Sequence, residues 1–522
     1  MLKTKIANYI KKTIKKSIPI EIFVPENEKF GHYSTNAALR LAKLQGKNPM
    51  EIAEEINLKL KTKNLKLFEK IEIAPPGFIN FWLAPKTFQD EIKEILKKKE
   101  KYGNLTLRQA QGKKVNIEFI SANPTGPLTI GNGRSGFCGD VLAKVLGKAG
   151  YSIIKEYYIN DTGEQIKKLG HSVLGDKQAV YKGDYIEKLR KNIKEKDPAK
   201  AGAKAAEIIL EKMIKPTVKK MGIKFDKWFS EKSLYKSRAV EKIIDEFKKK
   251  GLIYKKEGAV WFRAEKFGDD KDRVLIKTNE EKTYFASDLA YLKNKFERRF
   301  DKLIIFLGAD HYGYINRIKA AAEALGYKKE KLVFIIIQLV RLLKEGKEIR
   351  MSKRTGFYVT INELIEEVGS DATRFFFLMS SPDTHMNFDL DLAKKQSPQN
   401  PVYYVQYAAV RCGSVLRKSK INITTSDVVI LGLLNTPEDI NLMRILARFP
   451  EIIEEAANNY NPQILVRYAL NLAKEFHNFY EKERIISEEP SLRSGRLALI
   501  KASQIIFKNL FNLLGIKLPS KM

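Results

Sequence analysis

The chain has 522 residues, of which 44% are hydrophobic, so it is long enough for about three domains that each bury a core. Its 95 Lys and Arg residues exceed its 62 Asp and Glu residues, which leaves a formal net charge of +33. A surplus of this size favours nucleic acid as a partner, although a generally lysine-rich composition would also produce it.

The number of cysteines, the spacing of the histidines and the lengths of the apolar runs exclude several classes of protein. Cys138 and Cys412 are the only cysteines, which is typical of a reduced, cytoplasmic protein. The five histidines are too scattered for zinc-ligand spacing, so no structural metal is expected. The first 20 residues carry no continuous apolar core, and the longest apolar run, 332–337, has the length of a buried strand. We therefore expect neither a signal peptide nor a membrane segment.

Residues 1–112 are predicted to form a small appended α+β domain. The pattern indicates a basic helix, a strand at 21–24, helices at 34–43 and 49–60, and strands near Ile71 and at 78–83. Ser34 is expected to cap the second helix, and Pro49 suits the first turn of the third. The lysines and aromatic residues favour contact with RNA, while a solvated basic face over an aromatic core is the alternative. A polar segment at 106–114 is predicted to link this domain to the next.

The stretch 113–164 constrains the chain most. It predicts a strand at 114–120, a loop containing Asn123, and a helix that ends at Gly150 with the first turn at 131–133 free to attract an anion. The letters G-N-G-R-S-G at 131–136 are similar to a dinucleotide fingerprint, but about ten residues separate Ile120 from Gly131, where the fingerprint has its first glycine at the strand end. There is also no Gly-Lys pair followed by Ser or Thr. We therefore predict a nucleotide pocket of another design.

The rest of the middle region predicts a doubly wound, Rossmann-type parallel sheet over residues 113–398. A second strand is expected at 153–158, a helical insertion at about 166–262, resumption of the sheet near Val274, and strands at 303–307 and 332–337. The ligand should lie beyond the carboxyl ends of the strands, where the strand order switches.

Residues 399–522 are predicted to form an all-α bundle with helices at 402–416, 437–457, 462–482 and 495–514. Tyr403, Tyr404, Tyr407 and Arg411 are spaced to lie near one helix face, where they could stack on unpaired bases. Packing in the bundle core is the alternative for such tyrosines.

Two groups of residues suit chemistry on a nucleoside triphosphate and a cation. Thr129, Asn132 and Lys353 supply a hydroxyl, an amide and a loop cation for phosphates, although an ordinary loop lysine is the alternative for Lys353. Glu118, Tyr284 and Asp288 would hold a planar cation such as a guanidinium. Surface acidity is the alternative for the two carboxylates.

Five motifs occur in order: S-A-N-P-T-G-P-L-T-I-G-N-G-R at 121–134, E-Y-Y-I-N-D at 156–161, G-A-D-H-Y-G-Y at 308–314, R-M-S-K-R at 350–354 and D-A-T-R-F at 371–375. Together with F-G-H-Y-S-T-N at 30–36 and P-G-F-I-N-F at 76–81, they resemble the arginyl-tRNA synthetase family over nearly the whole chain. The resemblance implies a class I ligase that uses ATP with Mg²⁺ to form arginyl-adenylate. The arginyl group would then pass to the 2′-OH of the terminal adenosine of tRNA(Arg).

The resemblance also implies roles for individual residues. Catalysis would fall on Thr129, Asn132 and Lys353, and ATP binding on these three with Gly131, Gly308, Asp310 and Met351. The positions that imply arginine binding are Glu118, Asn123, Tyr284, Asp288 and Tyr314. Those that imply tRNA binding are Phe78, Asn80, Tyr403, Tyr407 and Arg411.

The chain departs from the family pattern at its two signature histidines, which are Thr129 and Asn132 here. An asparagine amide can still donate a hydrogen bond where an imidazole would. Two alternatives remain open: a catalytically weak or inactive tRNA-binding paralogue, and a class I synthetase for another amino acid. A cytoplasmic monomer is expected.

Overall fold

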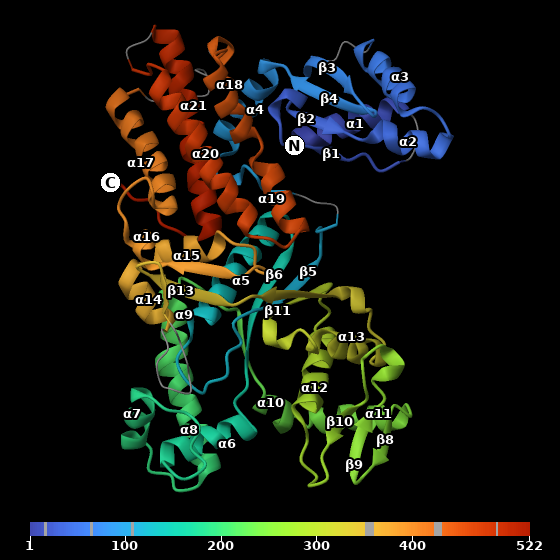
Figure 1. Cartoon of the computed structure of the whole chain (residues 1–522), viewed down its shortest axis with the longest axis vertical. Coiled ribbons are helices and arrows are strands. Elements are labelled where there is room, and N and C mark those ends of the chain that lie inside the picture. The colour runs from blue at the N-terminus through green and yellow to red at the C-terminus, as the bar shows by residue number, and fades with distance from the viewer. Residues whose placement is uncertain (15–17, 63–65, 106–108, 350–359, 422–430, 487–488) are drawn as a thin grey trace.

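The computed structural model describes residues 1–14, 18–62, 66–105, 109–349, 360–421, 431–486 and 489–522 (Figure 1). An N-terminal α+β unit lies beside a long helical bundle, and a sheet-centred region lies below the bundle (Figure 1). The three regions follow the predicted fold class. The predicted linker at 106–114 falls partly outside the described residues.

The N-terminal unit is a four-stranded antiparallel sheet of order β1-β2-β4-β3 with three helices. Its strands are β1 (Ile22–Phe23), β2 (Tyr33–Thr35), β3 (Phe68–Ala74) and β4 (Phe78–Leu83), and its helices are α1 (Leu2–Ile14), α2 (Ala37–Gln45) and α3 (Pro49–Lys61). The chain then passes through α4 (Pro85–Lys98), which packs against the bundle. Two features follow from the sequence here: Pro49 opens α3 as predicted, and Asn48 caps that helix by accepting from the Met50 N–H at 2.9 Å.

The predicted helix start at Ser34 is wrong. Ser34 lies in β2, where it pairs with Phe23 and with Asn80, and α2 begins three residues later. Pairing with two strands that are distant in sequence overrides the local capping pattern, because it satisfies the same backbone groups.

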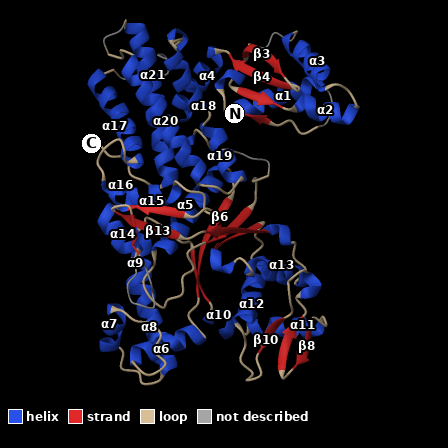
Figure 2. Cartoon of the chain, viewed as in Figure 1, coloured by secondary structure: helices blue, strands red, loops and turns tan. Residues whose placement is uncertain are grey.

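The central sheet has five parallel strands in the order β12-β11-β5-β6-β7. Figure 2 shows strands of this sheet, including β6, with helices nearby. The strands are β5 (Lys114–Glu118), β6 (Ser152–Ile159), β7 (Lys227–Ser230), β11 (Lys302–Gly308) and β12 (Leu332–Ile337). The connecting helices include α5 (Ile130–Lys148), α12 (Tyr284–Glu297) and α13 (Tyr314–Ala324). The order reverses at β5, since the chain first builds outward to β7 and then returns to the other side as β11. The predicted doubly wound topology is confirmed, and its switch point lies between β5 and β11.

The segment 166–262 was predicted to be a helical insertion, and this is only partly right. Its helices are α6 (Glu164–Leu174), α7 (Asp184–Asn192), α8 (Pro198–Ile209), α9 (Lys215–Lys220), α10 (Lys232–Lys236) and α11 (Ala239–Lys249). The same segment also supplies β7 to the central sheet, and β8 (Ile253–Lys256) and β9 (Ala259–Phe262) to a second sheet. A strand of four residues has too little periodicity to be found among charged helices.

The central sheet does not resume near Val274. That residue lies in β10 (Arg273–Ile276), which pairs antiparallel with β9 in the separate sheet β10-β9-β8. The next strand of the central sheet is β11, as its parallel pairing with β5 shows. The prediction failed because a short β-branched run has the same sequence pattern whichever sheet it joins.

A third small sheet and several helices connect the central sheet to the bundle. The sheet has the order β14-β13-β15, with β13 (Val340–Lys344), β14 (Lys347–Ile349) and β15 (Met386–Asp389). The helices are α14 (Ile361–Val368), α15 (Ser370–Leu378) and α16 (Leu390–Lys394). Short 3₁₀ turns elsewhere are η1 (Glu28–Phe30), η2 (Lys99–Lys101), η4 (Glu265–Phe267), η5 (Ala309–His311) and η6 (Lys329–Lys331), and a π-turn, η3 (Leu210–Ile214), joins α8 to α9.

The bundle consists of α17 (Pro401–Ser419), α18 (Pro437–Ala447), α19 (Phe449–Asn458), α20 (Gln463–Lys482) and α21 (Pro490–Leu514). The single helix predicted at 437–457 is two helices, because Pro450, in the first turn of α19, has no N–H to donate to the preceding turn. By length and composition α21 could cross a membrane, but 72% of its apolar window is buried inside the protein. It is therefore a core helix of the bundle.

Candidate active site

The turn after β5 bends sharply and carries the chain over the carboxyl end of the sheet. Ile120 and Ser121 have φ values of +66° and +39°, a left-handed conformation that is rare for a β-branched residue. Two hydrogen bonds hold the turn: the Ile120 N–H donates to Ser135 Oγ at 3.1 Å, and Ser121 Oγ accepts from the Tyr158 N–H at 3.0 Å. Because such strain persists only where the surroundings enforce it, this turn is a candidate functional feature.

Thr129 and Asn132 form a cap at the N-terminus of α5. The Asn132 side-chain oxygen accepts from the Thr129 N–H and from the Thr129 hydroxyl, both at 2.9 Å. The amide oxygen is thereby turned back toward Thr129, which leaves the amide Nδ2 to face away from the cap. Within the described ranges, no residue accepts a hydrogen bond from this Nδ2. The site thus has a free N–H donor at the end of a helix, where anions are attracted.

The turn at 131–133 was expected to remain free for a ligand, but not all of the glycines at the start of α5 do so. A Cβ at Gly133 would lie 2.4 Å from the Ile361 side chain, and one at Gly136 would lie 2.7 Å from Met221. These two positions are needed for close helix packing. At Gly131 the nearest atom would be Thr129 Oγ1 at 3.8 Å, so only this glycine leaves open space.

Glu118, at the end of β5, belongs to a buried charge network. It accepts from the Tyr291 hydroxyl at 3.2 Å and forms an ion pair with Lys295, which is 1% exposed. The same Tyr291 hydroxyl donates to Glu156 at 2.5 Å, and Arg298 pairs with Glu156 at 2.8 Å. All of these bonds to Glu118 use Oε2, and no described residue hydrogen-bonds its Oε1. Glu118 therefore already has one cation and keeps one oxygen for a ligand.

Two further carboxyl groups form no ion pair with a described residue, although the charge of Arg317 acts on one of them, Asp288. Asp288 lies on α12 one turn after Tyr284, as predicted, and Glu231 follows β7. Among the described residues neither forms an ion pair. Burial raises the pKa of Asp288 to about 7, with the Glu118 charge adding to the rise and the Tyr314 phenol opposing it. Burial likewise raises the pKa of Glu231 to about 7, with the Asp288 charge adding to it.

Carboxyl groups of this kind suit a cationic ligand, because a bound cation would compensate the buried charge. Glu231 escaped the sequence interpretation since it lay in the segment interpreted as helical. The signal that could have found it is the aromatic strand K-W-F-S directly before it.

Asn123 and Tyr284 meet at one residue that the sequence interpretation missed. Asn123 Nδ2 donates to Gln165 Oε1 at 2.5 Å, and the Gln165 N–H donates to the Tyr284 hydroxyl at 3.3 Å. Tyr284 is 42% exposed, so its ring is available to a ligand. Gln165 thus joins the loop after β5 to the first turn of α12.

The residues predicted to bind ATP are divided between two strand ends. Gly308 ends β11, the neighbour of β5, and Asp310 follows in the exposed turn η5. A Cβ at Gly308 would lie 2.6 Å from Asp310 Oδ1, so a side chain here would displace Asp310. Met351 and Lys353 lie outside the described residues. The chain returns at Thr360, which forms a β-bridge with Thr129.

The predicted tRNA-binding residues of the bundle share one face of α17. The rings of Tyr403 and Tyr407 are stacked with centroids 6.2 Å apart, and Arg411 Nη2 donates to the Tyr407 hydroxyl at 2.8 Å. In the N-terminal unit, Phe78 packs edge-on against Phe23, and Asn80 is only 4% exposed. RNA contact by these five residues stays a prediction.

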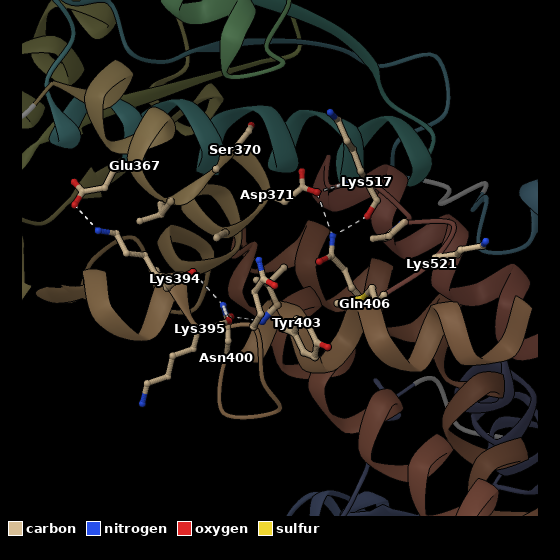
Figure 3. A pocket seen from close by; sticks show the side chains of 18 residues that line it. Glu367, Ser370, Asp371, Lys394, Lys395, Asn400, Tyr403, Gln406, Lys517 and Lys521 are labelled. Carbon is tan, nitrogen blue, oxygen red and sulfur yellow. Dashed lines mark hydrogen bonds and ion pairs between the residues drawn. The ribbon is translucent and has the colours of Figure 1, made fainter. Parts of the chain in front are cut away.

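Tyr403 also lines a cavity of about 670 Å³ between α15, α16, α17 and the C-terminal tail (Figure 3). Gln406 forms part of its wall and donates to Asp371 Oδ2 at 3.1 Å. Four lysines contribute to the lining: Lys394, Lys395, Lys517 and Lys521. The cavity is therefore basic, and it is separate from the turn at the start of α5.

Comparison with known proteins agrees with this geometry. Residues 91–184 and 176–378 match the family described as tRNA synthetases class I (R), catalytic domain, so the sheet and its α5 turn define a class I aminoacyl-tRNA synthetase. Residues 1–83 match the arginyl tRNA synthetase N terminal domain, and residues 405–522 match the DALR anticodon binding domain. The chain belongs to the arginyl-tRNA synthetase family.

Individual relatives cover the chain almost completely. It is 43% identical to an arginine–tRNA ligase of Carboxydothermus hydrogenoformans over 97% of this chain and 94% of that one. It is 42% identical to the corresponding ligase of Citrifermentans bemidjiense over 96% and 95% of the two chains. The structure of the Thermus thermophilus arginyl-tRNA synthetase has the same fold, with a TM-score of 0.80 at 20% identity and complete coverage of both chains.

Proposed function

We propose that this protein attaches arginine to tRNA(Arg) in two steps that share the site at the carboxyl end of the central sheet. In the first, an arginine carboxylate oxygen attacks the α-phosphorus of ATP, and pyrophosphate leaves. In the second, the 2′-OH of the terminal adenosine attacks the arginyl carbonyl carbon, its proton is lost, and AMP leaves. The observation that carries the proposal is the set of carboxyls around Glu118, of which Asp288 and Glu231 form no ion pair with a described residue.

The guanidinium of arginine would enter between these carboxyls. Glu118 would offer its remaining oxygen, and Asp288 would ionise and pair with the cation. Tyr284 would cover the guanidinium with its exposed ring, and Tyr314 would orient Asp288 through its phenol. Asn123 would accept from the α-amino group. Glu231 joins this group as a residue suggested by the structure.

ATP would lie between the α5 turn and the end of β11. Thr129, Gly131 and Asn132 would face the phosphates, with the Asn132 Nδ2 as the donor that replaces a histidine. Gly308 and Asp310 would border the nucleoside, and Met351 and Lys353 would complete the site, as the family resemblance implies. Lys353 would neutralise the charge that develops when pyrophosphate leaves.

Mg²⁺ would enter as part of the ATP substrate complex. No group of three or more potential ligands is arranged to hold a metal among the residues that the structure describes. The proposed role of the ion is to neutralise the triphosphate.

The tRNA would be held by both outer regions. Tyr403, Tyr407 and Arg411 of the bundle would contact the anticodon arm, and Phe78 and Asn80 of the N-terminal unit would contact the body of the molecule. The net charge of +33 supports such binding through the phosphates. We also propose that the protein works as a monomer in the cytoplasm.

Charging of total tRNA with each amino acid, in the presence of ATP and Mg²⁺, tests the proposal. Arginine alone should be attached. If another amino acid is attached instead, the arginine assignment fails although the class remains. In that case, the charging reactions of Asp288→Ala and Glu118→Ala would depend on arginine no differently from that of the parent.

Thr129 and Asn132, which stand in place of the signature histidines, favour one alternative function. A paralogue that binds tRNA without catalysis would bind tRNA tightly and show no ATP–pyrophosphate exchange with arginine, even when tRNA is present. An active ligase would show that exchange. Measurement of tRNA binding and of exchange on one preparation separates the two functions.

A further inference from the structure

Arg374, from the motif D-A-T-R-F, joins three regions that are distant in sequence. Arg374 lies on α15, and it is buried with 1% exposure. Nε donates to the Leu514 carbonyl at 2.5 Å, Nη1 donates to the Met221 carbonyl at 2.9 Å, and Nη2 pairs with the Asp140 carboxylate. These partners belong to the last bundle helix, to the end of α9, and to α5. A planar guanidinium spreads its donors over three nitrogens and can reach three separate acceptors, whereas the three donors of a lysine share one nitrogen.

The chain is shaped to accept this side chain at the end of the bundle. Gly515 caps α21 with φ +70°, and a Cβ there would lie 2.6 Å from the Arg374 guanidinium carbon. One turn before Arg374, Asp371 accepts from the Lys517 N–H at 3.2 Å and from Gln406 Nε2 at 3.1 Å. The helix α15 therefore holds the end of the bundle at two points.

Asp140, the partner of Arg374 on α5, is also held by several contacts. Asp140 is 1% exposed and also pairs with Lys144 at 3.0 Å and Lys155 at 3.2 Å. Asp140 and the cap residue Thr129 lie on the same helix, about three turns apart. A shift of the Asp140 end of α5 would therefore be carried along the helix to Thr129 and Asn132.

We propose that Arg374 is a positioning residue that couples the anticodon-binding bundle to the ATP-binding end of α5. When the anticodon arm binds, the position of the α21 end would determine the position of Arg374. Through Asp140, Arg374 would in turn determine the position of the Thr129 cap on α5. Loss of a buried bond in this path is costly, so the bundle and α5 move together. The inference rests on the proposed function, because it requires that the protein charge tRNA.

The experiment compares two substrates: tRNA(Arg), and the same tRNA with its anticodon replaced. Gly515→Ala pushes on Arg374 from the bundle side, and Asp140→Asn weakens the contact from the α5 side. Gly251→Ala is the control, because Gly251 has a similar φ of +65° and no atom lies within 4 Å of the place that its Cβ would take. Each variant is first compared with the parent by thermal unfolding. Arg374→Lys, which keeps the charge, provides a third variant if either of the others fails to fold.

In the parent protein, replacement of the anticodon should lower kcat at least tenfold. In Gly515→Ala and Asp140→Asn, kcat for intact tRNA should fall toward the value for the replaced anticodon, while the latter changes less than twofold. Gly251→Ala should behave as the parent. Equal losses of kcat with both tRNAs would overturn the proposed coupling. A parent kcat that does not depend on the anticodon would also overturn it. Failure of the parent to charge any tRNA with arginine would instead reject the proposed function.

Discussion

Glu231, which follows β7, and Asp288, on α12, lie close enough for their charges to interact, and each has a pKa of about 7. Burial is the main cause in both groups, and the charge on Asp288 raises the pKa of Glu231 further. Since neither forms an ion pair within the described ranges, and the Arg317 charge only partly offsets the burial of Asp288, the surroundings favour their protonated forms before a ligand binds. A bound guanidinium would favour the ionised forms.

Arginine binding should therefore release protons and strengthen as pH rises. Below pH 7 each carboxyl must lose a proton before it can pair with arginine, so the Kd should fall by up to about tenfold per pH unit for each group. The gain should level off above pH 8. Titration calorimetry between pH 5.5 and 8.5 measures both the Kd and the proton release. In Asp288→Asn the slope should decrease by one proton, and a Kd that is independent of pH in the parent would contradict the prediction.

The stability of the ligand-free protein should change in the opposite direction. Between about pH 4 and 7 the folded state binds more protons at Asp288 and Glu231 than the unfolded state does, so these groups lower the free energy of unfolding as pH rises through their folded pKa. Glu231→Gln should flatten this part of the stability curve. Urea unfolding at pH 5, 6, 7 and 8 checks it, and identical pH slopes in parent and variant would speak against the raised pKa.

The two functions of the Asn132 side chain can be separated by substitution. Asn132→Ala removes the cap on Thr129, so it should cost about 1 kcal/mol of stability and also lose the outward Nδ2 donor. Asn132→Asp keeps the cap oxygen and exchanges the donor for a charged oxygen in the first turn of α5, so its stability should be at least that of the parent. Both variants should lose about 100-fold or more in kcat for ATP–pyrophosphate exchange. An Asp variant with parental kcat would show that the amide donor takes no part in catalysis.

Lys353 is the loop cation of the proposed site. If it contacts the phosphates, Lys353→Ala should cost about 2 to 4 kcal/mol of transition-state stabilisation, seen mainly in kcat. Lys347→Ala is a matched control, because Lys347 is an exposed lysine of β14 in the same part of the chain. Pyrophosphate exchange measures both. Equal exchange rates of the two variants would mean that Lys353 does not stabilise the transition state.

The strands of the central sheet that could be predicted from the sequence are those with buried, β-branched runs, such as β11 and β12. The strand β7 could not, because its place in the sheet depends on pairing with β6 rather than on its own four residues. Glu231 was missed for the same reason. Glu118 and Asp288 were predicted both as carboxylates suited to a cation and from the family resemblance, but the sequence contains no sign that Lys295 already occupies one side of Glu118.

The glycines at the start of α5 show a second limit of sequence patterns. The letters G-N-G-R-S-G suggested a loop open to phosphate, yet Gly133 is explained by the close approach of Ile361 from α14. That contact joins positions more than 200 residues apart, which no local pattern reveals. The sequence alone thus predicted where a ligand should lie, and the structure separates the glycine that leaves open space from those that pack.

This distinction leads to a prediction about Gly133. A Cβ at this position would lie 2.4 Å from Ile361, so Gly133→Ala should destabilise the protein by about 1 to 3 kcal/mol, although alanine favours helices. Gly147→Ala lies in the same helix with no atom within 4 Å, and it should stabilise the protein by up to about 1 kcal/mol. Ile361→Ala removes the colliding atoms, so adding it to Gly133→Ala should cost less than it does in the parent. Denaturant unfolding of the four variants measures this coupling. Additive effects of the two substitutions would mean that Ile361 is not what requires a glycine at 133.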